Sequence, residues 1–153
     1  MTGVEMAAVD AQLFWLSATT PNDQFLLYAF DGRPSADALA GIRRRAEACA
    51  ALAVRVVDDD RWRYPRWEPA AVTDAHFAVH DEQIGPDDAA VLSRLDPLDA
   101  TRTAWRVHLF RANVVVVQIC HALGDGTRSS ALAAALLGRA GPTPPVAAPQ
   151  RGR

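Results

Sequence analysis

His121 follows a predicted buried strand, a position in which a histidine could act as a general base. The apolar run of residues 114–120 predicts a buried strand, and His121 follows it directly. Asp125 and Gly126 come next, ahead of a predicted helix over residues 127–137. Imidazole accepts a proton near neutral pH, so a histidine at the end of a strand could deprotonate an attacking hydroxyl or amine. The spacing therefore predicts a general base with a carboxylate close behind it.

The residues around this histidine have separate expected roles. Gly124 and Gly126 would let the backbone turn tightly and approach a substrate. Asp125 is expected to be structural, holding the turn after His121, for example by pairing with an arginine. Cys120 and His121 are adjacent, and neighbouring strand residues point to opposite faces, so a Cys–His nucleophile pair is not expected.

The expected fold class follows from the order of the predicted helices and strands, which do not alternate strictly along the chain. Helices are predicted at 10–16, from 34–35 to 49, at 86–95 and at 127–137; strands are predicted at 24–30, 53–57, 61–64, 75–80, 104–110 and 114–120. The last two strands form a predicted hairpin, and its second arm is apolar on both faces, as in a central strand. The expected class is α+β, with a mixed or antiparallel sheet flanked by helices.

Composition indicates one globular domain that works in the cytoplasm. The chain has 153 residues, 50% of them hydrophobic, and a formal net charge of −2. We expect the domain over residues 1–140 and a proline-rich, disordered tail over 141–153. No apolar stretch approaches the ~18 residues of a membrane-spanning helix, and no signal peptide is evident.

Neither nucleic acid nor metal is an expected ligand. The basic and aromatic run 61–67 lies beside Asp58, Asp59 and Asp60, which cancel its charge, so a half-buried hairpin is expected there. His76 and His80 share a face but lack a third ligand of suitable spacing, so they are expected to be surface histidines.

A longer pattern upstream of the histidine resembles a known enzyme family. Residues 97–110 read Pro-Leu-Asp-Ala-Thr-Arg-Thr-Ala-Trp-Arg-Val-His-Leu-Phe. This block resembles the Pro-Leu-Asp-x-x-x-x-x-Trp-Arg-x-x-Leu stretch that precedes the active-site motif of bacterial wax ester synthase/diacylglycerol acyltransferases. Residues 10–14 and 30–32 are similar to the same family, and the resemblance extends over roughly residues 6–138.

The resemblance implies a chloramphenicol acetyltransferase-like fold, which condensation domains of nonribosomal peptide synthetases share. Such proteins have two lobes, and the motif His-His-x-x-x-Asp-Gly lies on the N-terminal lobe at their interface. The second histidine is the general base, which corresponds to His121, and Asp125 and Gly126 match the rest of the motif. Cys120 replaces the first histidine, a residue that supports the catalytic one.

By the same resemblance, the expected reaction is acyl transfer from a thioester to a hydroxyl or an amine. Coenzyme A or phosphopantetheine would carry the acyl group as co-substrate, and no bound cofactor is expected. The chain would be a natural half, a split subunit or a truncated form that needs a complementary C-terminal lobe or a second copy of itself. An acyl carrier protein is a further candidate partner. Cys120 and the missing lobe leave a second function open, a non-catalytic partner, scaffold or ligand-binding lobe.

Overall fold

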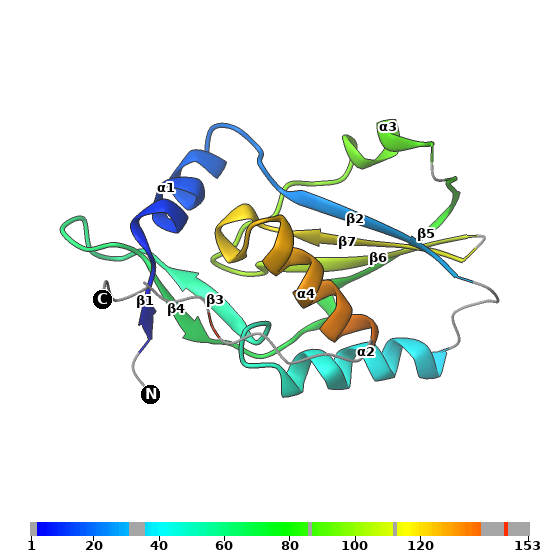
Figure 1. The fold of residues 1–153 in the computed structure, drawn as a ribbon, viewed down its shortest axis with the longest axis horizontal. Helices are drawn as coiled ribbons and strands as arrows, with labels where there is room; N and C mark the ends of the chain where they lie inside the picture. The colour runs from blue at the N-terminus through cyan, green and yellow to red at the C-terminus, as the bar shows by residue number, and fades with distance from the viewer. Residues whose placement is uncertain (1–2, 31–35, 86, 112, 139–145, 147–153) are drawn as a thin grey trace.

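The computed structural model describes residues 3–30, 36–85, 87–111, 113–138 and Val146. Its strands are β1 (Val4–Glu5), β2 (Gln24–Ala29), β3 (Val54–Val57), β4 (Arg66–Pro69), β5 (Phe77–Gln83), β6 (Trp105–Arg111) and β7 (Val114–Ile119). Its α-helices are α1 (Ala8–Ser17), α2 (Ala36–Ala48), α3 (Ala89–Leu92) and α4 (Gly126–Leu137). Two short 3₁₀ helices, η1 (Asp74–His76) and η2 (His121–Leu123), complete the described elements (Figure 1).

The larger sheet has the strand order β2-β7-β6-β5 (Figure 1). β7 runs antiparallel to both of its neighbours, and β5 runs parallel to β6, so the sheet is mixed. The predicted hairpin is β6 and β7, with Val107 opposite Val117. All six residues of β7 are buried, which confirms the central strand that its continuous apolar sequence predicts. The α+β class with a mixed sheet is confirmed.

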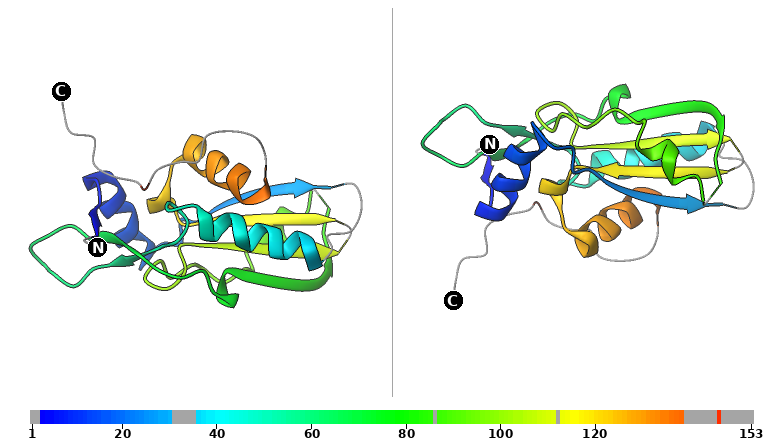
Figure 2. Two further views of the ribbon diagram at one scale, coloured as in Figure 1. Left: turned by 90° about the horizontal axis from the view of Figure 1, so that it is seen from below. Right: turned by 90° about the horizontal axis from the view of Figure 1, so that it is seen from above.

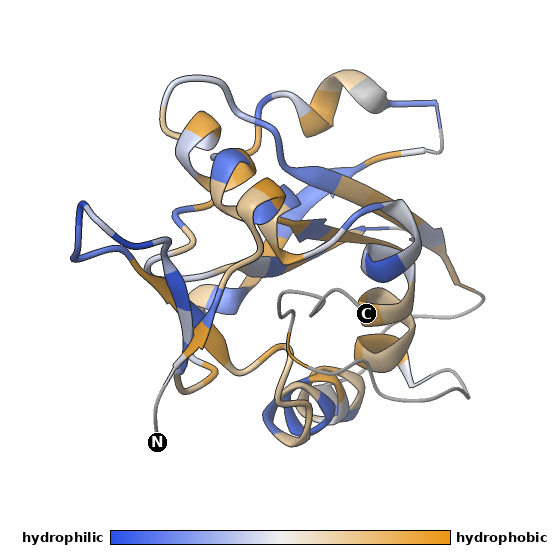
Figure 3. Cartoon of the chain, turned by 60° about the vertical axis from the view of Figure 1, so that its left-hand side comes forward, coloured by the Kyte–Doolittle hydropathy of each residue, from blue (hydrophilic) through white to orange (hydrophobic). Residues whose placement is uncertain are grey.

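The smaller sheet, β1-β4-β3, is antiparallel and corrects one prediction. The strand that returns along β3 is β4, not residues 61–64. Those residues form an exposed turn, where Trp62 is 82% exposed and the chain is mostly hydrophilic (Figure 3). The cause is local: the Asp60 side chain accepts a hydrogen bond from the backbone N–H of Trp62 at 2.8 Å, which bends the chain away from the strand.

The two faces of the larger sheet carry separate apolar clusters. Figure 2 shows α4 and α3 on opposite sides of this sheet. On the α4 side, the main core joins side chains of α2 and α4 to alternate residues of the hairpin, among them Val107, Val117 and Ile119. On the α3 side, Val114 and Val116 pack with Phe110 and Ile84 in a smaller cluster. One strand therefore contributes to both layers of the core.

Helix boundaries follow the sequence signals at α2 and α4 and depart from them at α3. Ile42, Ala46 and Cys49 are buried at spacings of three and four, as predicted for α2. α4 ends at Gly138, whose φ of 77° is left-handed. The prediction of a helix over 86–95 is too long: α3 has four residues, because Ser93 Oγ donates to the Ala90 carbonyl and the chain continues as turns.

Two sequence predictions fall outside the described residues. These are the predicted helix start at 34–35, ahead of the observed α2, and most of the expected tail, residues 141–145 and 147–153. Val146 is described, and it packs partly buried against the main core. Within the described residues, none of the helices has both the length and the apolar character needed to cross a bilayer.

Replacing Trp105 by Phe should lower the free energy of unfolding by about 2 kcal/mol. Trp105 is fully buried, and its Nε1 donates to the Leu52 carbonyl at 2.8 Å, which links β6 to the segment after α2. The shorter side chain leaves a cavity and an unpaired carbonyl. Urea unfolding of both proteins measures the effect. The matched change Trp62→Phe, on the exposed turn, should stay within about 0.5 kcal/mol of the wild type; equal losses would contradict the packing account.

Candidate active site

His121 lies where β7 ends and η2 begins. The hairpin pairing continues one residue beyond β7, since the Cys120 N–H donates to the Ala104 carbonyl at 2.9 Å. The chain then turns into η2, which packs against α1. His121 is partly exposed, but its Nδ1 is enclosed and has no hydrogen-bond partner within the described part of the chain. Nδ1 is therefore inaccessible to solvent, and another molecule can reach the ring only from the side of Nε2.

Cys120 packs into the main core. It is 4% exposed, and its carbonyl accepts the N–H of Leu123 at 3.0 Å in η2. Burial raises the pKa of its thiol to about 12. The thiol is therefore protonated at neutral pH and serves as a small apolar side chain, not as a nucleophile.

Asp125 fixes the start of α4. Its Oδ1 accepts the backbone N–H of Arg128 at 2.9 Å, and its carbonyl accepts the N–H of Ser129 at 2.8 Å. Arg128 turns back to donate from Nε to the Leu123 carbonyl at 2.8 Å. These bonds tie η2, which contains His121, to the first turn of α4.

The two glycines of the motif differ in their surroundings. A Cβ on Gly124 would lie 2.7 to 2.9 Å from the Cγ, Cβ and Cδ of Arg128, too close for any other residue without a shift. A Cβ on Gly126 would meet nothing within 4 Å, and this residue is the exposed first residue of α4. Gly124 therefore lies closely against the Arg128 side chain, and the space beside Gly126 is open.

Asp10 of α1 is a charged neighbour that sequence reasoning did not select. Burial raises the pKa of its carboxyl, and among nearby charges Arg128 lowers this pKa, Asp125 raises it and His121 lowers it. α1 thus brings a half-buried carboxylate into the electrostatic surroundings of His121. Asp10 opens the predicted helix 10–16, but the sequence gives no sign that this helix meets η2.

A chain of hydrogen-bonded polar side chains crosses the larger sheet, and its centre, His108 and Gln118, is buried. His80 Nε2 lies 2.9 Å from His108 Nδ1, and His108 Nε2 lies 2.8 Å from Gln118 Oε1. Gln118 Nε2 in turn donates to Asp23 Oδ2 at 2.9 Å. Asp23 also accepts the N–H of Leu98 at 2.8 Å, so the network reaches from β5 to the loop before β2.

Burial shifts the pKa of two members of this network. It lowers the pKa of His108 to about 4, and it raises the pKa of the Asp23 carboxyl. His76 is also buried: it accepts the Thr73 N–H at 3.1 Å and packs 4.5 Å from the Trp105 ring, so the prediction of surface histidines is wrong there. In the described ranges, no three His, Cys, Asp or Glu side chains are grouped to hold a metal ion.

Solved structures share this architecture. The four-domain nonribosomal peptide synthetase AB3403 matches with a TM-score of 0.67 and 15% identity, over 91% of this chain and 12% of that chain. A mutant of the starter condensation domain of rhizomide synthetase RzmA, in complex with C8-CoA, matches with a TM-score of 0.62 and 16% identity, over 88% and 34%. The wax ester synthase/diacylglycerol acyltransferase from Marinobacter aquaeolei matches with a TM-score of 0.56 and 18% identity, over 84% and 37%.

The chain has the fold of one chloramphenicol acetyltransferase-like lobe. This lobe spans roughly a third of the condensation-domain and wax ester synthase chains, 34% and 37% of their lengths. No model of a protein family matches the sequence, and no curated protein matches it. At such low identities the likeness establishes the fold of the lobe, and its structural neighbours are condensation and acyltransferase domains.

Substituting Ala for Gly124 should destabilise the lobe by about 1–3 kcal/mol, because Arg128 must move and its bond to Leu123 is strained or lost. Thermal or urea unfolding measures this loss. Gly126→Ala is the matched control in the same motif, since its methyl group enters open space at a helical position and should leave stability unchanged or raise it by up to about 1 kcal/mol. Equal effects at both positions would contradict the contact with Arg128.

Acid should destabilise the lobe through His108. Folding lowers the pKa of His108 from 6.5 to about 4, so between these pH values the unfolded chain binds a proton that the folded chain does not. The stability from this group is fully present above pH 6.5 and is lost as the pH falls toward about 4. Relative to His108→Gln, the wild type should lose up to about 3 kcal/mol more over this range in urea unfolding. Parallel pH profiles of the two proteins would show that His108 is not held neutral.

Proposed function

We propose that this lobe takes part in acyl transfer from a thioester to a hydroxyl or an amine, with His121 as the general base. The observation that carries the proposal is the placement of His121 at the end of the buried strand β7, with Nδ1 enclosed. Because Nδ1 is enclosed, Nε2 is the nitrogen assigned to proton transfer. The fold that the lobe shares with condensation and acyltransferase domains supports this assignment.

The proposed transfer is direct and forms no covalent intermediate with the enzyme. The acceptor oxygen or nitrogen attacks the thioester carbonyl as His121 Nε2 removes its proton. A C–O or C–N bond forms, the C–S bond breaks, and the protonated imidazole returns the proton to the departing thiolate. Imidazole suits both halves of this cycle because its ordinary pKa lies near neutral pH.

Other residues of the lobe position this base. Asp125 and Arg128 hold η2 against the start of α4, and Gly124 allows the close approach that this arrangement needs. Asp10 adds a half-buried carboxylate to the surroundings of this base. Cys120 supports the turn from within the core, in place of the polar side chain of the related motif.

A second lobe completes the proposed enzyme. This chain spans 34% to 37% of the condensation-domain and wax ester synthase chains, and His121 is partly exposed on the lobe alone. A partner chain or another copy would enclose the reacting groups and exclude water. The RzmA condensation domain was solved with C8-CoA, which supports a coenzyme A thioester as donor; a phosphopantetheine thioester on a carrier protein has the same reacting group.

The alternative is a non-catalytic partner, scaffold or ligand-binding lobe. Cys120 favours this alternative, because it stands at the position of the first motif histidine and its buried, protonated thiol offers His121 little polar support. The two functions differ in one measurable property, which is whether thioester turnover depends on His121.

His121→Ala should lower thioester turnover by about 10²–10⁴-fold, the usual contribution of a general base. The protein is assayed alone and with the product of an adjacent reading frame, after light scattering has shown which complex forms. Release of thiol from a panel of acyl-CoA thioesters, in the presence of alcohol and amine acceptors, measures the rate.

Asp125→Asn is the matched control for this assay. Its amide oxygen can still accept the Arg128 N–H, so turnover should stay within about threefold of the wild type. Turnover that is unchanged in His121→Ala, or no turnover by any assembled form, would reject the acyltransferase function and favour the non-catalytic alternative.

A further inference from the structure

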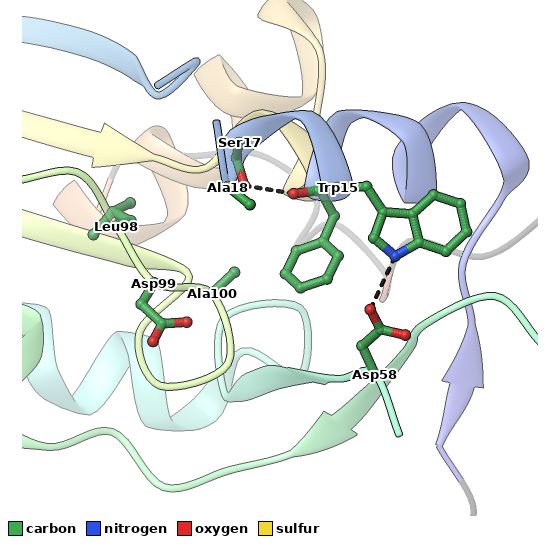
Figure 4. Close-up of a pocket in the computed structure, with 8 residues that line it drawn as sticks. Trp15, Ser17, Ala18, Asp58, Leu98, Asp99 and Ala100 are labelled. Carbon is green, nitrogen blue, oxygen red and sulfur yellow. Dashed lines mark hydrogen bonds between the residues drawn. The ribbon is translucent and has the colours of Figure 1, made fainter. Parts of the chain in front are cut away.

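A pocket of about 380 Å³ lies between α1, the end of β3 and the loop before β6 (Figure 4). Its lining residues are Phe14, Trp15, Ser17, Ala18, Asp58, Leu98, Asp99 and Ala100. None of them belongs to the candidate active site. We propose that this pocket binds a small organic cation, a primary amine attached to one aromatic ring or a short apolar chain. This inference does not depend on the acyltransferase proposal.

The size and the floor of the pocket define the apolar part of this ligand. Small-molecule sites span about 300–1,000 Å³, so this pocket suits a ligand at the small end of that range. Leu98 and Ala100 are 8% and 5% exposed, and Phe14 packs against the main core, so these side chains form an apolar surface. Burying an aromatic ring or a short alkyl chain against this surface would favour binding, because apolar area leaves water.

The floor is held in place by hydrogen bonds made elsewhere in the fold. Leu98 N–H donates to Asp23 at 2.8 Å, and the Ala100 carbonyl accepts the N–H of Val56 at 2.9 Å. These bonds connect the loop before β6 to Asp23, directly before β2, and to β3. The pocket is therefore formed in the absence of a ligand, which reduces the conformational entropy lost on binding.

The charge of the lining selects a cation. Asp58 and Asp99 lie on either side of the pocket in Figure 4, and no arginine is among the lining residues. Asp58 Oδ2 accepts a hydrogen bond from Trp15 Nε1 at 2.9 Å, a neutral donor that orients the carboxylate and leaves its charge in place. Asp99 Oδ1 accepts the N–H and the hydroxyl of Thr101 at 3.0 and 2.6 Å, and its Oδ2 pairs with Arg102 Nε at 4.0 Å. Thr101 is neutral and the pair with Arg102 is exposed, so both leave the carboxylate able to attract a cation.

Trp15 lies in the wall of the pocket and holds the Asp58 carboxylate in place. Its indole is 43% exposed. An uncharged ligand of the same shape would gain only the apolar contact, and an anion would be repelled by both aspartates.

The test uses 2-phenylethylamine as the probe, with 2-phenylethanol and phenylacetate as uncharged and anionic probes of similar size. Titration calorimetry of the full chain should show saturable one-to-one binding of the amine, weaker binding of the alcohol and none of the anion. Asp58→Asn keeps the oxygen that accepts from Trp15 and removes the charge, so it should weaken amine binding about three- to fivefold and leave the alcohol unaffected.

Two further variants make the result decisive. Ala18→Phe, at an exposed position of the lining, should fill the pocket and abolish binding of every probe without changing thermal unfolding. Asp37→Asn, on the exposed first turn of α2, is the matched charge control and should bind the amine as the wild type does. Equal affinity for amine and alcohol, no effect of Asp58→Asn, or no binding of the amine would each overturn the proposal.

Discussion

Burial of β7 on both faces is the constraint on which the rest of this lobe depends. Its six residues are all buried, between β2 on one side and β6 on the other. Side chains that alternate along it fill the main core on one face and the smaller cluster on the other, so one strand orders both layers. The chain leaves this strand at Cys120 and reaches His121 at once, which gives the imidazole a rigid foundation.

The buried polar residue of β7 restricts how this strand can pair with its neighbours. Gln118 is the buried polar residue of β7, and it pairs with His108 on one side and Asp23 on the other. A buried amide left without partners would cost about 1–3 kcal/mol, so this pairing favours one register of the hairpin and one position of the loop before β2. This loop follows α1, and its Asp23 accepts the N–H of Leu98, a residue of the pocket floor in the loop before β6.

Elements specified by local sequence signals were predicted correctly, and features that depend on distant contacts were not. The hairpin, α2 and α4 were predicted closely, because an apolar period and terminal residues such as Gly138 act over a few positions. The return strand of the smaller sheet was misplaced, because the Asp60 side chain bends the chain where polar and aromatic residues alternate. His76 was expected at the surface; its burial against Trp105 comes from a packing contact that no local pattern encodes.

The sequence by itself determined the fold class and the placement of His121 after a buried strand. Both follow from the order of polar and apolar residues, which acts through hydrophobic burial and is visible in one dimension. Only the tertiary structure decided what surrounds that histidine and what lies beside it. Asp10 approaches the site, and Asp58 and Asp99 share a pocket, through contacts between distant segments of the chain. Such contacts depend on how helices and loops pack in three dimensions, and side-chain spacing does not specify them.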